Sequence, residues 1–314
     1  MTAPSLTSPL VYVNVLVWNG ERWLKKCLDS LLTRDYDNFR VLAIDNHSQD
    51  RSRDIVRSGY PEVELVENER NFGFAEGHNI GIRYALGRGA DYVALLNQDI
   101  VAEPRWLTEL IQTTRDYGEF GILAPTQYDY EGKGIDPVFL RILNQNADFR
   151  RDFAGHAALR RIYEVPDTFG AAMFFRRETF LRVGLFDPLF FMYSEEADFF
   201  QRAQYHGIRT AIVTTSKIRH WHVSSHPEKK DVLRISYLAY RNRYMAILKD
   251  PRQSWPANLG GWIVALLRDL RGDCSSWRGL LYAALRLLVQ TWLIVYLPVI
   301  AYRRSQEKKR PCYL

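Results

Sequence analysis

The stretch DYVALLNQD, residues 91–99, decides how the rest of the chain is interpreted. Its apolar part, residues 92–96, stops abruptly at Asn97, Gln98 and Asp99. A short apolar run bounded by polar residues predicts a strand that is buried on both faces of a parallel sheet. A carboxylate just past such a strand lies where open α/β sheets bind ligands. Asp99 is therefore predicted to hold a divalent cation on a nucleotide diphosphate. The alternative is that Gln98 and Asp99 begin a turn and cap the helix after Pro104.

The composition is that of a globular protein, with 314 residues of which 47% are hydrophobic and 25% charged. This length allows one large domain or two smaller ones. The net charge of +6 indicates an anionic partner, such as nucleic acid, nucleotide or a membrane surface. Cys27, Cys274 and Cys312 are scattered, which predicts free thiols in a reducing compartment. The first residues lack a basic region followed by an apolar core, so we expect a cytoplasmic location.

The first third of the chain alternates between predicted strands and helices. Strands are predicted at 10–18, 40–44, 62–66 and 92–96, and helices at 21–32, from Ser48 or Asp50 to 59, and at 79–86. This order predicts an α/β fold, in which a mostly parallel sheet has helices on both faces. Polar residues follow three strands, at Asn19, Asp45 and Asn97. Because the ends of parallel strands share one edge, we expect these clusters to meet in one cleft.

The middle of the chain is predicted to be less regular. Residues 128–166 are polar and are predicted to form a long excursion over the acceptor side of the cleft, or a plain surface insertion. Beyond it we expect a strand at 168–175, a helix at 177–183, a turn at 184–188, a helix from Ser194 to His206 and a strand at 210–215. His220 and His222 follow shortly after the last strand.

These residue types suit a metal-assisted transfer of a sugar from a nucleotide. Asp45 can accept a hydrogen bond from a pyrimidine N–H or a ribose hydroxyl. Asp99 is a hard oxygen ligand for Mg²⁺ or Mn²⁺, and His220 could complete the metal shell. Such a cation neutralises the diphosphate leaving group. Candidates for the general base that deprotonates the acceptor hydroxyl are Glu195, Glu196 and Asp198.

From about residue 11 to 249 the chain resembles glycosyltransferase family 2, and within it the bacterial rhamnosyltransferase-like branch. The matching stretches are VLVWNG (15–20), DNHSQD (45–50), NFGFAEGHN (71–79), LLNQD (95–99), FD (186–187), FMYSEEAD (191–198), His220 and RNR (241–243). The resemblance implies a GT-A fold and inversion by single displacement. It also implies a nucleotide-sugar donor, dTDP-rhamnose first and UDP-hexose second. The implied acceptor is a glycan or polyprenyl-linked glycan of surface-polysaccharide assembly, and nucleic acid is not expected as a partner.

The resemblance also assigns roles to residues. Glu196 is the implied base, Asp99 and His220 are the implied metal ligands, and Gly170 and Asp187 the implied acceptor contacts. The donor-binding residues it implies are Val17, Asn19, Asp45, Asn71, Gly73, Asn79, Asn97 and Gln98.

Three departures from the family pattern matter. Gln98 stands where an acid is usual, which leaves Asp99 as the only carboxylate ligand. Glu196 stands where the base is usually aspartate. A second histidine, His222, follows two residues after His220. Of the two, His220 fits the position of the family's histidine better.

Several of these residues have plainer interpretations. Glu195 and Glu196 lie in the first turn of a predicted helix capped by Ser194, where the helix dipole stabilises acids by ~0.3–1 kcal/mol. Asp198 is spaced for an i,i+4 salt bridge with Arg202, and this structural role is the one that we expect for Asp198. Asp187 precedes Pro188 and could serve the turn instead of an acceptor. Gly73 and Gly77 resemble a phosphate-binding loop only loosely, and a turn is equally compatible.

From about residue 229 the chain is predicted to be helical, at 232–248, 259–270 and 280–302. The last segment is long enough to span a bilayer, but Arg286, Gln290 and Pro298 interrupt it. Tryptophans and basic ends favour helices that lie in the membrane interface, peripheral to the cytoplasmic face. The alternative is packing on the catalytic core. We thus predict a catalytic domain at 1–228, with halves at about 8–125 and 126–228, and a helical region at 229–314.

Two other function classes are alternatives to a glycosyltransferase. A catalytically inactive binding protein with the same fold is conceivable because of Gln98. A sugar nucleotidyltransferase would need a glycine-rich and basic triphosphate loop near the N-terminus, which residues 11–20 lack.

Overall fold

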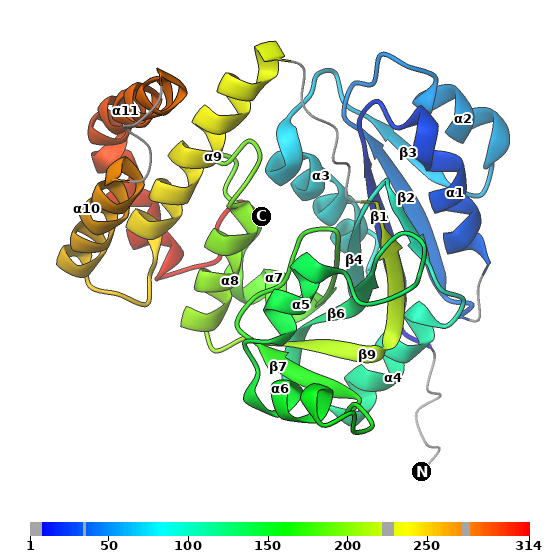
Figure 1. Cartoon of the computed structure of the whole chain (residues 1–314). Helices are drawn as coiled ribbons and strands as arrows, with labels where there is room; N and C mark the ends of the chain where they lie inside the picture. Colours follow the sequence, from blue (N-terminus) through cyan, green and yellow to red (C-terminus); the bar gives the residue numbers. More distant parts are fainter. Residues whose placement is uncertain (1–7, 34–35, 222–228, 272–276) are drawn as a thin grey trace. The chain divides into compact units, whose positions relative to one another are not determined.

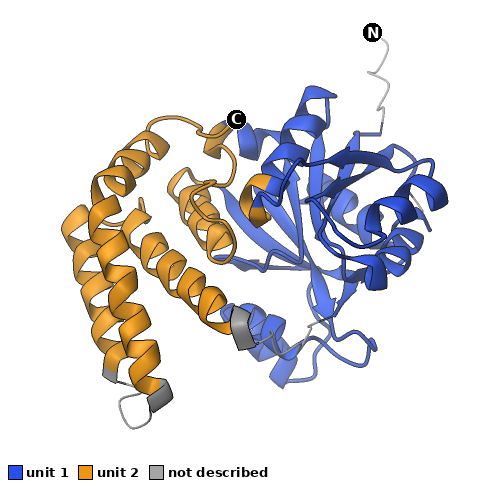
Figure 2. Cartoon of the chain, turned by 90° about the horizontal axis from the view of Figure 1, so that it is seen from above, with its two compact units in different colours: residues 1–72, 77–181, 208–222 blue, residues 73–76, 182–207, 223–314 orange. Residues whose placement is uncertain are grey.

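The computed structural model describes residues 8–33, 36–221, 229–271 and 277–314, and these form two compact units (Figure 2). Unit 1 comprises residues 1–72, 77–181 and 208–222, and unit 2 comprises 73–76, 182–207 and 223–314. Cys27 and Cys312 are free thiols, as predicted. Cys274 and His222 lie outside the described residues.

Unit 1 is built on one sheet, which has nine strands within the described residues, in the order β3-β2-β1-β4-β8-β6-β9-β5 with β7 paired to β9 (Figure 1). The strands are β1 (Val11–Val17), β2 (Phe39–Asp45), β3 (Glu64–Glu67), β4 (Tyr92–Asn97), β5 (Ile100–Ala102), β6 (Phe120–Tyr128), β7 (Ile162–Val165), β8 (Ala172–Arg176) and β9 (Arg209–His220). The helices up to α7 are α1 (Glu21–Leu32), α2 (Ser52–Gly59), α3 (Gly73–Gly87), α4 (Trp106–Asp116), α5 (Pro137–Leu143), α6 (Ala147–Ala154) and α7 (Arg177–Val183).

The order of the first four strands places a topological switch point at β1. β1 pairs in parallel with β2 on one side and with β4 on the other, so the chain changes direction across the sheet at β1. In open α/β sheets ligands bind at such a switch point, outside the carboxyl ends of the strands. Asn19 and Asp99 lie just past the ends of β1 and β4. The predicted parallel sheet is confirmed for β1–β4, while β8 runs antiparallel to β4.

Both faces of this sheet are covered by helices, as predicted. Successive strand residues point to opposite faces. On one face Val13 and Val15 share a buried cluster with Leu28 of α1. On the other face α3 lies so close that a Cβ on Gly77 would come within 2.7 Å of Leu16, and one on Gly81 within 2.8 Å of Asn14. These glycines therefore allow α3 to pack directly on β1.

The prediction that residues 128–166 are irregular is wrong. The segment holds α5, α6 and β7, and it encloses a second hydrophobic cluster in which Phe149 and Tyr163 meet edge to face at 5.2 Å. Asp136 and Asn146 cap the two helices, because their side chains accept hydrogen bonds from backbone N–H groups of the first turn. Many polar residues of the segment are helix caps or members of surface ion pairs. They separate the few apolar residues of the cluster along the sequence, so that no clear helix or strand period is visible.

Unit 2 contains α8 (Glu195–Tyr205), α9 (Lys229–Lys249), α10 (Trp255–Arg271) and α11 (Trp277–Glu307), which confirms the predicted C-terminal helices. α9 packs against α8, α10 and α11. Two polar residues in the apolar part of α11 point inward: Arg286 donates to the Tyr240 hydroxyl at 2.8 Å, and Gln290 accepts from Trp262 Nε1 at 2.7 Å. Many apolar residues of α11 are exposed instead, a reversal of the usual pattern for a helix in water.

Candidate functional site

Gln98 joins the end of β4 to the end of β1. Its side-chain oxygen accepts from the backbone N–H of Trp18 at 2.9 Å, and its side-chain amide donates to the Trp18 carbonyl at 3.0 Å. A Cβ on Gly20 would collide with this amide, so the glycine that breaks the first strand makes room for it. Both polar ends of Gln98 are thereby used in holding the two strand ends together.

Hydrogen bonds also join the loop after β2 to the loop after β1. Asn19 adopts a positive φ of 48°, a conformation that asparagine tolerates better than most residues. Its side-chain oxygen accepts from the Gln49 backbone at 2.8 Å, and its backbone N–H donates to Ser48 Oγ at 2.9 Å. The next N–H, of Gly20, donates to Ser52 Oγ at 2.8 Å. These serine contacts were not predicted, although the polar run after Asp45 was.

Asp45 offers one open acceptor at this edge. Its side chain is buried, with Oδ2 accepting from the Ser48 backbone at 3.0 Å and lying 3.8 Å from Arg53 Nε. Within the described ranges, Asp45 Oδ1 is buried and has no hydrogen-bond partner. A buried acceptor without a partner is costly, and a ligand N–H or O–H would satisfy it.

Asp99 and His220 meet at the carboxyl end of β4. β5 pairs antiparallel with β9 so that Ile100 lies opposite His220, and this register places His220 Nε2 3.4 Å from Asp99 Oδ1. The Trp221 N–H donates to the Asp99 carbonyl at 3.0 Å, which holds the two segments together. In the part of the chain that the structure describes, Asp99 Oδ1 is buried without a hydrogen-bond partner.

This pair fits a divalent cation that takes its remaining ligands from elsewhere. A carboxylate oxygen and an imidazole nitrogen are both suitable ligands for Mn²⁺, and the carboxylate alone suits Mg²⁺. Among the described residues, no group of three or more His, Cys, Asp or Glu side chains could hold a metal ion. A metal here would therefore rely on oxygens of a diphosphate and of water for most of its shell.

Most of the other residues assigned to donor binding make hydrogen bonds within the protein or are buried. Asn71 accepts from the Asn46 side-chain amide at 2.9 Å, and Asn79 is fully buried. The Val17 carbonyl accepts from the Asn46 backbone at 2.7 Å. The Asn97 N–H donates to the Ala171 carbonyl at 3.0 Å. That bond places Gly170 in the turn just before β8. Asn46 belongs to the polar cluster predicted at the end of the second strand but had no predicted role of its own, and these contacts make it central to this loop.

Gly73 belongs to unit 2 and serves packing. It has a φ of +78°, and a Cβ there would collide with the Phe191 carbonyl. The next N–H, of Phe74, donates to that carbonyl at 2.7 Å. Together with the contact of Gly77 on Leu16, this favours the turn interpretation of the two glycines over a phosphate-binding loop.

The candidate base lies at the start of α8 in unit 2. Tyr193 and Ser194 both have a positive φ, of 76° and 64°. The prediction that the Ser194 side chain caps the helix is wrong, because it makes no capping hydrogen bond. Burial, and then the neighbouring Glu196 carboxylate, raise the pKa of Glu195 well above its ordinary range. Glu195 is 2% exposed, whereas Glu196 is partly exposed, so Glu196 is the member of the pair that can reach a substrate.

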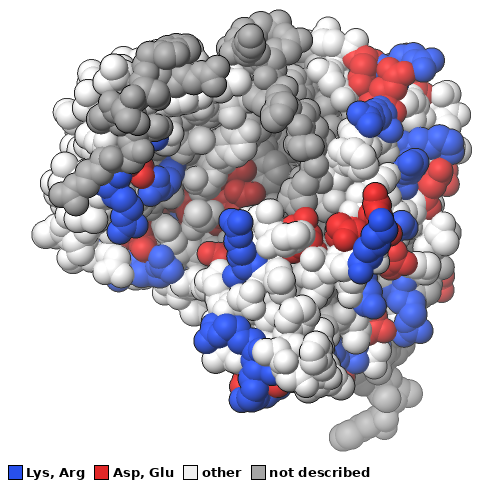
Figure 3. Space-filling view, viewed as in Figure 1, with Lys and Arg blue, Asp and Glu red and all other residues white. Residues whose placement is uncertain are grey.

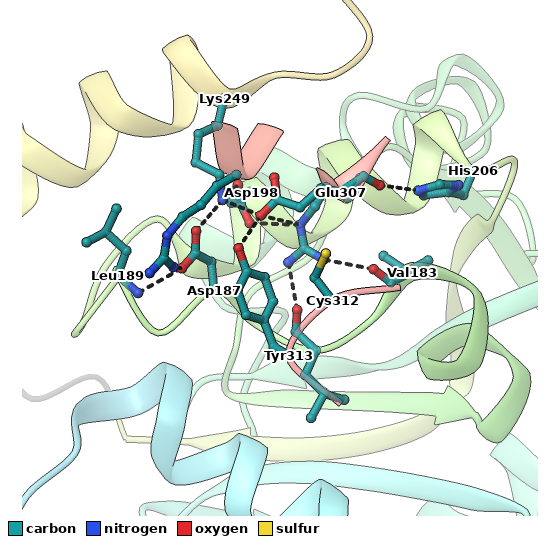
Figure 4. Close-up of polar contacts among 12 residues, drawn as sticks. Val183, Asp187, Leu189, Asp198, His206, Lys249, Glu307, Cys312 and Tyr313 are labelled. Atoms are coloured by element: carbon teal, nitrogen blue, oxygen red, sulfur yellow. Dashed lines mark hydrogen bonds and ion pairs between the residues drawn. The ribbon is translucent and has the colours of Figure 1, made fainter. Parts of the chain in front are cut away.

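Asp198 and Asp187 are held in a buried ion cluster, which comprises Asp187, Asp198, Arg202, Lys249, Arg303 and Glu307 (Figure 4). The predicted i,i+4 bridge is confirmed, with Arg202 Nε 2.9 Å from Asp198 Oδ2. Asp198 Oδ1 lies 2.9 Å from Lys249 Nζ, so both of its oxygens are paired. This geometry favours a structural role for Asp198 over general base catalysis.

Asp187 serves the turn rather than a substrate surface. It is fully buried, and its Oδ1 accepts from the Leu189 N–H at 2.9 Å, while Oδ2 lies 2.5 Å from Lys249 Nζ. Arg303 also pairs with Oδ1. The assignment of Asp187 to acceptor contact is therefore corrected: the carboxylate is enclosed and its oxygens are engaged.

The charges of the ion cluster balance. Burial opposes the charge of Lys249, but the carboxylates of Asp187, Asp198 and Glu307 outweigh it and hold the pKa of this lysine well above its ordinary value. Burial likewise opposes the charge of Asp187, and Lys249 followed by Arg303 nevertheless keeps its pKa below the ordinary range. Local spacing predicted only the Asp198–Arg202 bridge, because the other members of the cluster are distant along the chain.

Charged side chains of both signs are intermixed on the face of the molecule seen in Figure 3. Among the described residues many charged side chains are paired, as in Arg57 with Glu67 at 2.5 Å and Arg209 with Glu164 at 2.6 Å. On this face the basic residues do not gather into one continuous area, despite the net charge of +6.

Comparison with known proteins identifies relatives of this chain. A family model described as Glycosyl transferase family 2 matches residues 12–184. An uncharacterised glycosyltransferase from Haemophilus influenzae is 27% identical over 110 residues, which is 33% of this chain and 32% of that protein. The chain thus spans about a third of the length of that relative. The low-salt glycan biosynthesis hexosyltransferase Agl10 from Haloferax volcanii is 24% identical over 222 residues, or 70% of each chain.

Solved structures support the fold. The mannosyltransferase PcManGT from Pyrobaculum calidifontis, in complex with GDP-Man and Mn²⁺, has a TM-score of 0.55 at 18% identity and covers 97% of this chain and 89% of its own. Residues 1–349 of S. aureus TarS give a TM-score of 0.56 at 13% identity, over 95% and 88% of the two chains.

Proposed function

The chain belongs to glycosyl transferase family 2. On that premise we propose that this glycosyltransferase moves a sugar from a pyrimidine nucleotide diphosphate to a hydroxyl of a glycan or polyprenyl-linked glycan. The reaction is an inverting single displacement, with dTDP-rhamnose as the favoured donor and a UDP-sugar as the second choice. One observation carries the proposal: Asp45 Oδ1 and Asp99 Oδ1 are buried acceptors without hydrogen-bond partners in the described chain. Both lie at the carboxyl edge of the sheet.

Each end of the donor has a candidate residue. Asp45 accepts a hydrogen bond from the base or the ribose. Asp99 and His220 would hold a divalent cation, Mg²⁺ or Mn²⁺, and this cation would neutralise charge on the leaving diphosphate. Gln98 keeps the strand ends at β1 and β4 in place while contributing no charge. Glu196 accepts the proton of the acceptor hydroxyl as that oxygen attacks the anomeric carbon.

A panel of nucleotide sugars tests the donor assignment by protection against thermal unfolding, because a ligand stabilises by RT ln(1 + [L]/Kd). Protection by dTDP- or UDP-sugars that needs Mn²⁺ or Mg²⁺ and is lost in Asp99→Asn would support the proposal. Asp29→Asn, which alters a surface pair 51% exposed at the carboxylate, is the matched control. Equal protection of wild type and Asp99→Asn, with and without EDTA, would remove the metal assignment.

The alternative of a catalytically inactive binding protein differs in turnover. It requires that donor binding persist while no sugar is transferred or hydrolysed with any donor of the panel. Measurable turnover in the wild type that disappears in Glu196→Gln, with donor protection retained, excludes it. Unchanged turnover in Glu196→Gln would instead remove the base assignment.

We also propose that α10 and α11 attach the protein to the cytoplasmic face of a membrane, lying in its interface. Residues Gly279–Glu307 are long and apolar enough to cross a bilayer by length and composition, with a mean hydropathy of 1.8 over an 18-residue window within the helix. An interfacial position fits better, because Arg286 and Gln290 pair inward with Tyr240 and Trp262 of the neighbouring helices. The exposed apolar side chains on the two helices are Ile263, Val264, Leu267, Leu280, Leu281, Leu287, Leu288, Ile294, Val295, Val299 and Tyr302.

Flotation with vesicles that contain phosphatidylglycerol tests the attachment. Leu288 and Val295 are 58% and 69% exposed, and the double change Leu288→Asp with Val295→Asp should leave the protein in the soluble fraction. Leu181→Asp is the control, since Leu181 is 48% exposed but lies on α7. Failure of the wild type to float, or equal flotation of the double variant, would overturn the proposal.

A further inference from the structure

The loop that leads into α8 is held by hydrogen bonds that its backbone carbonyls accept from other parts of the chain. Asn242 of α9 donates through Nδ2 to the carbonyls of Met192 and Tyr193, at 2.8 and 3.0 Å. Arg241 donates to the Leu189 carbonyl at 3.2 Å. The Phe74 N–H at the start of α3 donates to the Phe191 carbonyl that lies between them. The residues that directly precede Glu195 and Glu196 are therefore held from α9 and α3.

These hydrogen bonds hold a segment whose backbone conformation is strained. Tyr193 and Ser194 are consecutive non-glycine residues with positive φ. Such conformations persist only where the surrounding structure over-determines them, and they cluster at functional sites. Asn242 bonds to the carbonyl of Tyr193 and to the one before it, so it contacts the loop where the left-handed pair begins.

Asn242 is itself fixed in orientation. It is fully buried, and its side-chain oxygen accepts from Arg241 Nε at 2.8 Å, which leaves the amide nitrogen directed at the two carbonyls. The Arg241 guanidinium lies over the ring of Trp292 on α11, at 4.8 Å from the ring centroid. Burial lowers the pKa of Arg241, yet its ordinary value is so high that it stays charged. A chain of contacts thus runs from α11 through Arg241 and Asn242 to the loop.

We propose that Asn242, oriented by Arg241, is a positioning residue that holds the left-handed pair and so aims Glu196 at the acceptor hydroxyl. The inference rests on the proposed function, because it takes Glu196 as the base. It gives the C-terminal helices a second role besides membrane attachment. Without α9 the carbonyls of Met192 and Tyr193 lose their side-chain donor, and the first turn of α8 is no longer held in one conformation.

The chain offers a matched control in Asn258. Its Nδ2 donates to the carbonyls of Leu248 and Asp250, at 3.0 and 2.8 Å, and it is 3% exposed. Asn242→Asp and Asn258→Asp therefore remove the same two-carbonyl bridge from equally buried sites, but only the first touches the loop before Glu195. Asn242→Ser, which keeps one hydroxyl donor, is the milder variant should the aspartate hinder folding.

The kinetic test compares kcat with the KM for the donor. We expect Asn242→Asp to lower kcat at least tenfold with donor KM unchanged, Asn242→Ser to fall between, and Asn258→Asp to stay within about threefold of wild type. In the Glu196→Gln background, Asn242→Asp should add little further loss, because both changes act on one group. Equal kcat values for Asn242→Asp and Asn258→Asp, or full additivity with Glu196→Gln, would overturn the proposal.

Hydrogen exchange gives a readout that does not depend on activity. Amides of residues 190–198 should exchange at least tenfold faster in Asn242→Asp than in wild type, and Asn258→Asp should leave them unchanged. Unaltered exchange in Asn242→Asp would refute the positioning role. If the wild type transfers no sugar from any donor, the proposed function fails, while the exchange comparison still decides whether Asn242 holds the loop.

Discussion

Replacing Lys249 with methionine is expected to destabilise the protein by about 3–5 kcal/mol, the usual cost of removing one partner from a buried ion pair. Lys249 is fully buried, and its Nζ lies 2.5 Å from Asp187, 2.9 Å from Asp198 and 2.6 Å from Glu307. Among the members of the ion cluster, the methionine leaves these three carboxylates with two cations, Arg202 and Arg303. With a total stability of about 5–15 kcal/mol, such a loss is a large part of the whole.

The loss of unfolding free energy in Lys249→Met should become smaller as the pH falls. In the wild type the pKa of Asp187 is lowered in the folded state, so its stabilising contribution is present above about pH 4 and is lost as the pH falls through the folded pKa. In Lys249→Met the main lowering charge is gone, and burial then raises the pKa of this carboxyl. The difference between variant and wild type is therefore largest near neutral pH and shrinks as the pH falls towards 4.

Urea unfolding at pH 7, 5.5 and 4.5, followed by tryptophan fluorescence, measures these differences. Lys25→Met is the control: Lys25 Nζ also lies 2.9 Å from a carboxylate, but the side chains are 73% and 51% exposed, so about 0.5 kcal/mol or less is expected. Adding Glu307→Gln to Lys249→Met restores the charge balance and should recover about 1–2 kcal/mol. A deficit below about 1 kcal/mol, or one that grows as the pH falls, would refute the reasoning.

Three further predictions concern the site. Because burial raises the pKa of Glu195, its neutral isostere should be tolerated: Glu195→Gln is expected to keep transfer within about threefold, while Glu196→Gln loses about 10²–10⁴-fold in initial rate. His220→Ala should weaken Mn²⁺ binding in the presence of nucleoside diphosphate by about tenfold, measured by calorimetric titration, and an unchanged titration would contradict its assignment. Gly20→Ala should push the Gln98 amide away from Trp18 and cost about 1–3 kcal/mol in urea unfolding; a neutral effect would show that Gln98 is not held there.

The parts of the fold that the sequence predicts are those with local causes. An apolar run of strand length that ends in polar residues marks the end of β1, β2 and β4, and the right-handed crossovers of a β-α-β chain bring these ends to one edge. For this reason the sequence alone predicts that Asp45 and Asp99 lie at the same edge of the sheet. His220 could be proposed as a metal ligand from its residue type and from the family resemblance, but the register of β5 on β9, which brings it to Asp99, has no local signal.

The remaining features depend on contacts between distant residues. Lys249 and Asp187 are 62 residues apart and meet only after α9 packs, so nothing in their neighbourhood marks the ion pair. Asn242 likewise acts on carbonyls about 50 residues earlier in the chain. The caps at Asp136 and Asn146 were visible in principle as acid or amide residues before short apolar segments, but helices of seven and eight residues are too short for a clear period.

β9 carries a change of register with a consequence for how the protein can vary. Pro125 of β6 lies opposite Val213, but the next residue, Thr126, lies opposite Lys217, so residues 214–216 bulge out of the ladder. The bulge separates a first part of β9 that packs in the core from a last part that presents His220 to Asp99. A single-residue deletion at exposed Thr215 should be absorbed there, whereas one at Arg219 would turn His220 to the opposite face. Residues 214–216 can therefore change in length without disturbing the alignment of the predicted metal ligands, whereas the paired residues on either side cannot.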